Sequence, residues 1–82
     1  MTDRTNRNII GPRVRLARLS EKPKATLADI SARLEVLDVK ISVNSLGKIE
    51  NGWQSVTDKQ LYALARVLKV TPNWLLGWEE KE

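Results

Sequence analysis

The chain has 82 residues and a mass of 9.3 kDa, which is enough for one small domain. It contains neither cysteine nor histidine, so disulfides, thiolate zinc sites, Ser–His triads and the commonest transition-metal ligands are excluded. No apolar run approaches the roughly 18–20 residues that span a bilayer, and the polar N-terminus lacks the apolar region of a secretion signal. We therefore expect a cytoplasmic protein without metal or cofactor.

The positive charge is concentrated near the N-terminus. The net charge is +4, yet residues 1–24 alone hold seven basic and two acidic side chains. Five of the seven are arginines, whose guanidinium binds phosphate through two hydrogen bonds. This pattern is equally compatible with a solvated surface and with a polyanionic partner.

Helix start and stop signals predict an all-α fold, a compact five-helix bundle. Pro12 stands at the first position of the first helix, and Pro23 ends that helix. Thr26 and Asp29 form a capping box for a second helix over residues 27–37. The third, fourth and fifth helices are indicated by their capping residues Ser42, Thr57 and Thr71 and, after the third and fifth, by the glycines Gly52 and Gly77.

The segments around these helices divide the chain into three parts. We expect a basic arm over residues 1–9, one domain over residues 10–78 and an acidic tail over residues 79–82. Arg4 and Arg7 of the arm either reach along a nucleic acid or belong to a frayed terminus. Between the second and third helices, residues 38–41 alternate polar and apolar side chains, which favours an extended connector.

Near the C-terminus, three large apolar residues admit two interpretations. We expect Trp74, Leu75 and Trp78 to close the core of the bundle. A patch for self-association is the second interpretation.

The second and third predicted helices have the layout of a helix-turn-helix DNA reader. In that motif the second helix enters a major groove about 12 Å wide, so its outward side chains meet base edges while its inner side packs on the domain. Within residues 42–50, Leu46 and Ile49 are predicted to face inward. The outward positions are Val43, Asn44, Gly47 and Lys48.

From about Ile10 to Leu76 the chain resembles the lambda-repressor-like, Cro-type helix-turn-helix regulators, also called the xenobiotic-response-element family. The resemblance is carried by residues 11–18, 26–34, 61–71 and 74–76, and above all by the run from Ser42 through Leu46-Gly47-Lys48-Ile49-Glu50-Asn51-Gly52. It implies sequence-specific binding of double-stranded DNA by a homodimer, in a bacterial or phage transcriptional repressor with no catalytic site. No small-molecule effector is expected.

The resemblance also implies roles for single residues. Val43, Asn44 and Lys48 match base-reading positions, although Val43 could equally pack on the connector. Arg18 and Glu50 match a structural ion pair. The expected phosphate contacts are Thr26, Ser42, Asn51, Trp53 and Gln54, joined by Arg13 or Arg15 from the first helix; packing over the end of the third helix is an equal alternative for Trp53.

Two features depart from the family pattern. Leu27 stands where the family usually has a glutamine that contacts phosphate, and the segment between the second and third helices is several residues longer than usual. Together with the near-neutral central region, Leu27 supports an alternative function. In that alternative the chain is a protein-interaction module, such as the antitoxin or anti-repressor of a pair, with weak DNA affinity.

Overall fold

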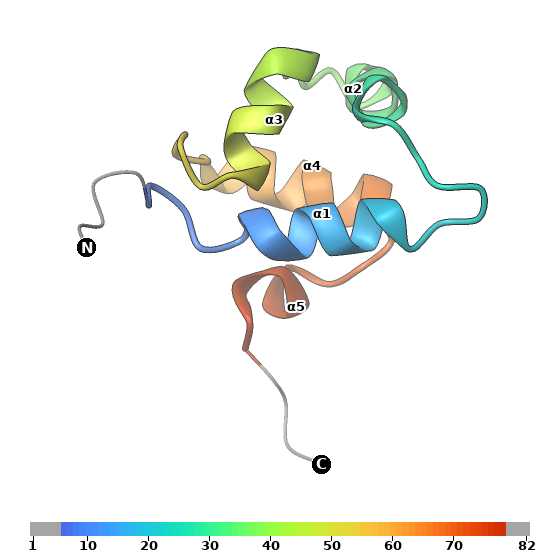
Figure 1. Cartoon of the computed structure of the whole chain (residues 1–82). Helices are drawn as coiled ribbons and strands as arrows, with labels where there is room; N and C mark the ends of the chain where they lie inside the picture. The colour runs from blue at the N-terminus through green and yellow to red at the C-terminus, as the bar shows by residue number, and fades with distance from the viewer. Residues whose placement is uncertain (1–5, 79–82) are drawn as a thin grey trace.

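Helix α1 lies between α3 and α5, in front of α4 in the view of Figure 1, and contacts all three. The structure is a computed structural model that describes residues 6–78, and within that range it contains helices and no strand. This confirms the predicted all-α class. The helices are α1 (Gly11–Leu19), α2 (Leu27–Val36), α3 (Val43–Glu50), α4 (Asp58–Leu68) and α5 (Pro72–Leu76).

Four of the five helices begin at a hydroxyl cap, as the sequence predicts. The side chains of Thr26, Ser42, Thr57 and Thr71 each accept a hydrogen bond from the backbone N–H three residues later. At Thr26 and Thr57 the third residue also returns a bond to the cap, completing a capping box. Helix α1 ends at Leu19, a few residues before Pro23.

The long connector between α2 and α3 is held in a defined extended shape. Asp38 takes a left-handed conformation with a φ of 66° just after α2. The Val39 N–H donates to the Leu34 carbonyl at 3.0 Å. The Ser31 hydroxyl donates to the carbonyl of Ile41 at 2.8 Å, and the Ile41 side chain is buried. The extra residues therefore form a connector that is hydrogen-bonded to α2 and leads to the Ser42 cap.

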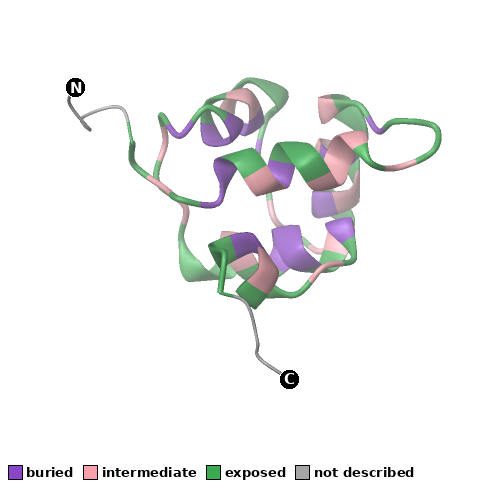
Figure 2. Ribbon diagram, turned by 60° about the horizontal axis from the view of Figure 1, so that its bottom comes forward, coloured by how far each residue is buried: buried purple, intermediate pink, exposed green. Residues whose placement is uncertain are grey.

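One continuous core fills the space between the five helices (Figure 2). The fully buried side chains include Leu34 of α2, Leu46 and Ile49 of α3, Leu64 of α4 and Leu75 of α5. The packing of Trp74 and Leu75 against this core confirms part of the expectation for the C-terminus. The expectation was wrong for Trp78, which is 70% exposed because it lies beyond the end of α5.

The first turn of α1 packs directly against the last turn of α3. A Cβ atom placed on Gly11 would lie 2.3 Å from the Ile49 carbonyl oxygen and 2.7 Å from that of Glu50. Only a residue without a side chain permits this approach, because both neighbouring atoms belong to backbone.

The described residues before α1 are joined to the rest of the domain by hydrogen bonds. The backbone N–H of Arg7 donates to the Gly52 carbonyl at 2.6 Å, and the Asn8 side chain bonds to the backbone of Ile49 and Gln54. The described part of the expected arm is thus bound to the loop after α3. Arg4 and the expected acidic tail, residues 79–82, lie outside the described residues.

Because of the close approach at Gly11, we expect alanine to change the folding stability very differently at Gly11 and at Gly47. Gly11→Ala forces backbone apart in a packed region and should destabilise the fold by about 1–3 kcal/mol. Gly47→Ala is the matched control, because its Cβ would meet only the Leu27 side chain at 3.9 Å. That change should be neutral or slightly stabilising, since alanine favours helix. Urea unfolding of both variants measures the difference, and equal stabilities would contradict the account.

Candidate nucleic-acid interface

Helix α3 presents one face to the core and the other to solvent. Leu46 and Ile49 are fully buried, whereas Asn44 and Lys48 are exposed. Val43 is 44% exposed, so a large part of it is open to solvent. The outer face of α3 thus carries an apolar, an amide and an ammonium side chain, those of Val43, Asn44 and Lys48, which we call the exposed row.

Gly47 differs from the expectation that it faces outward. It is half-buried, and a Cβ atom placed on it would point toward the Leu27 side chain at the start of α2. Leu27 itself is partly buried against the core. The leucine that departs from the family pattern therefore packs against α3 and joins the two helices of the motif.

The loop after α3 turns sharply and exposes its side chains. Gly52 has a φ of 78°, and the Trp53 N–H closes the turn by donating to the Lys48 carbonyl at 2.8 Å. Asn51 is exposed and Trp53 is 56% exposed. The indole of Trp53 is thus largely open to solvent rather than packed over the helix end. Gln54 is half-buried.

The two helix starts of the motif also carry expected contact residues. Thr26 and Ser42 are both exposed, and the hydroxyl of each accepts a hydrogen bond from the backbone N–H three residues later. The bonds that Asp29 receives from the backbone and side chain of Thr26 hold the pKa of that carboxyl below its ordinary value.

A buried ion pair fixes α3 against α1. Arg18 Nε donates to Glu50 Oε2 at 2.7 Å and Arg18 Nη2 donates to Oε1 at 2.9 Å. A third bond joins Arg18 Nη1 to the Ala25 carbonyl at 3.0 Å, just before the Thr26 cap. The hydrogen bonds to Glu50 raise the pKa of Arg18 above its ordinary value. One guanidinium therefore ties α1, α3 and the start of α2 together.

The structure separates the two remaining arginines of α1. Arg15 is exposed, and its Nε lies 4.0 Å from Glu50 Oε1, on the α3 side of the helix. Arg13 stacks over the Trp74 ring at 5.0 Å and donates to the Trp74 carbonyl at 3.0 Å. Because α5 and α3 lie on opposite sides of α1 (Figure 1), Arg13 is directed away from the α3 face. The two candidates for phosphate contact thus lie on different sides of α1, Arg15 toward α3 and Arg13 toward α5.

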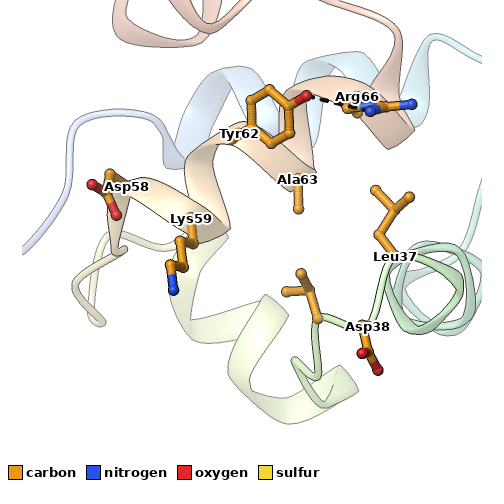
Figure 3. A pocket seen from close by; sticks show the side chains of 8 residues that line it. Leu37, Asp38, Asp58, Lys59, Tyr62, Ala63 and Arg66 are labelled. Carbon is orange, nitrogen blue, oxygen red and sulfur yellow. Dashed lines mark hydrogen bonds between the residues drawn. The ribbon is translucent and has the colours of Figure 1, made fainter.

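A shallow groove of about 590 Å³ lies elsewhere, between the connector and α4 (Figure 3). Its apolar part is formed by Leu37, Val39 and Ala63. Tyr62 lies at its edge and accepts a hydrogen bond from Arg66 at 3.3 Å. None of the expected base-reading or phosphate-binding residues lines this groove.

We expect removal of the Glu50 carboxylate to lower the folding stability much more than removal of the Glu21 carboxylate. Glu50→Ala leaves Arg18 charged, unpaired and almost buried (side-chain exposures of the pair are 12% and 6%), which should cost about 3–5 kcal/mol of folding stability. Glu21→Ala is the control, because it breaks a bidentate pair with Arg33 that is more open to water. We expect that change to cost below about 1 kcal/mol. Chemical denaturation measures both, and similar losses would contradict a clamping role for the buried pair.

The part of the chain that the structure describes has neither a cluster of metal-binding side chains nor a helix long and apolar enough to cross a bilayer. A family model for helix-turn-helix domains of the lambda-repressor and Cro type matches residues 24–75, more than half of the chain. No curated protein and no solved structure matches it. This family consists of DNA-binding regulatory domains and is not an enzyme family. The chain therefore belongs to the lambda-repressor and Cro-like helix-turn-helix family of DNA-binding, transcription-regulator-like proteins.

Proposed function

We propose that the protein is a bacterial or phage transcriptional repressor that occupies an operator and reads its bases with α3. The observation that carries this proposal is the exposed row Val43, Asn44 and Lys48 on a helix whose other face is fully buried. A helix held this firmly can enter the major groove as a rigid element. Such a role would place the protein in the cytoplasm, at the nucleoid.

Each residue of the row suits a different base edge. The Asn44 amide can donate and accept at adenine, the Lys48 ammonium can donate to guanine O6 and N7, and the Val43 methyl groups can contact a thymine methyl. The three side chains differ in chemistry, so together they can discriminate a short base sequence.

The expected phosphate contacts surround this row. Thr26 and Ser42 lie at helix starts, where free N–H groups and the helix dipole favour an anion. Asn51, Trp53 and Gln54 follow the end of α3, and Arg15 adds a charge from α1. We propose that these six residues orient α3 on the duplex. Arg13, which packs on Trp74, lies outside the proposed interface.

One domain of this size covers a short half-site, so we propose that two copies bind one operator as a homodimer. Two-fold symmetry of the protein would then appear as two-fold symmetry of the DNA, with half-sites about 10 bp apart.

The second candidate function is a protein-interaction module such as an antitoxin or anti-repressor. The groove between the connector and α4 favours it, together with the exposed Val36 at the end of α2. Nothing in the described part of the chain indicates what would cover that groove. The exposed row on α3 makes DNA reading the better supported function.

The proposal is tested by selecting random duplex DNA with the purified protein at about 150 mM salt. We expect a symmetric motif and a log–log salt slope of about −4 to −5, which corresponds to about five neutralised phosphates. Asn44→Ala/Lys48→Ala should lose the motif and keep salt-sensitive binding. Lys69→Ala is the control, because Lys69 is exposed at the far end of α4 and should leave the motif unchanged.

Two results would count against DNA reading by α3. Recovery of no motif by the unaltered protein would favour the interaction module. An unchanged motif in the double variant would show that other residues read the bases.

A further inference from the structure

Asn8 makes four hydrogen bonds that join three separate parts of the fold. Its Oδ1 accepts from the backbone N–H groups of Ile10 at 3.0 Å and Gly11 at 2.8 Å, at the start of α1. Its Nδ2 donates to the carbonyl of Ile49 at 3.1 Å, in the last turn of α3, and to that of Gln54 at 2.7 Å. One side-chain amide thus bridges α1, α3 and the loop that follows α3.

The chemistry of these four partners is specific for an amide. Two of them are donors and two are acceptors, so the side chain must present one oxygen and one NH₂ group in fixed directions. Aspartate would place a second oxygen against two carbonyls, and serine is too short and has too few donors to reach all four groups. An asparagine at position 8 therefore serves the loop after α3 as well as the start of α1.

The same arrangement places Arg7 beside the expected phosphate contacts. The Arg7 N–H donates to the carbonyl of Gly52 at 2.6 Å, and Gly52 lies between Asn51 and Trp53. The Arg7 side chain is exposed. The Arg7 backbone is thus held beside Gly52, the residue between Asn51 and Trp53, which are two of the proposed phosphate contacts.

We propose that Asn8 is a positioning residue for DNA binding, which holds the loop 51–54 and Arg7 in the arrangement that contacts phosphate. This inference rests on the proposed function. It adds that the segment before α1 is a built part of the interface, with Arg7 as a phosphate contact whose contribution depends on Asn8.

A double-mutant cycle between Asn8 and Arg7 tests the proposal on the full chain. Asn8→Ser removes the NH₂ group that donates to Ile49 in α3 and to Gln54 in the loop, and it keeps a hydroxyl that can cap α1. Arg7→Ala removes the charge. Binding to the selected duplex is measured over a range of salt, at a temperature where circular dichroism shows each variant to be folded. Should Asn8→Ser not fold, Arg7→Ala alone still tests whether the segment before α1 belongs to the interface, because its salt slope is measured with Asn8 unchanged.

Four results are expected. Asn8→Ser weakens duplex binding about tenfold. Arg7→Ala reduces the magnitude of the salt slope by about 0.9 per bound chain. In the Asn8→Ser background, Arg7→Ala changes the slope by less than half as much. The indole N–H signal of Trp53 is expected to shift on addition of DNA to the unaltered protein and to shift less in Asn8→Ser. A residue that contributed only to stability would change none of these readouts in the folded variant.

The proposal is overturned if Asn8→Ser binds the duplex as tightly as the unaltered protein. It is also overturned if Arg7→Ala has no effect, or has the same effect in both backgrounds. The Lys48→Ala variant separates this failure from failure of the proposed function. If Lys48→Ala alters the motif while the cycle is additive, only the role of Asn8 is wrong, whereas an unaltered protein that binds no duplex overturns both.

Discussion

The close contact between the start of α1 and the end of α3 is the constraint on which the rest of the structure depends. Gly11 allows the two backbones to meet, and the Arg18–Glu50 pair locks the helices a little further along. Both partners of that pair are nearly buried, so the attraction between them is weakly screened by water. A helix of eight residues such as α3 is too short to be stable alone, and this contact supplies the tertiary support that it needs.

Fixing α3 from the inside leaves its outer face free for recognition. The core takes Leu46 and Ile49, the ion pair takes Glu50, and Leu27 covers the side at Gly47. The side chains that remain exposed stand on a rigid helix, so little conformational entropy is lost when they meet a partner. Leu27, which stands where the family usually has a glutamine, lies beside Gly47 and is partly buried against the core.

The features that the sequence predicted are those set by local chemistry. Hydroxyl caps, glycine turns and the inward Leu46 and Ile49 follow from rules that act within a few residues, and the structure has them. The features that were missed depend on residues distant along the chain. Gly47 faces α2, Arg13 stacks on Trp74 sixty-one positions away, and Asn8 bridges to residues more than forty positions away. Pairing of Arg18 with Glu50 was expected from the family resemblance alone, since no local pattern connects those two residues.

We propose that DNA binds at the α3 face, and a chemical-shift map of the protein can show whether it does. The ¹⁵N-labelled protein is titrated with duplex DNA, and the shifts of its backbone amides are followed. If DNA binds at the α3 face, the largest shifts fall on residues 42–54, with smaller ones at Thr26 and Arg15, while α5 is unaffected. Shifts centred on the groove between the connector and α4, with α3 unchanged, would contradict it.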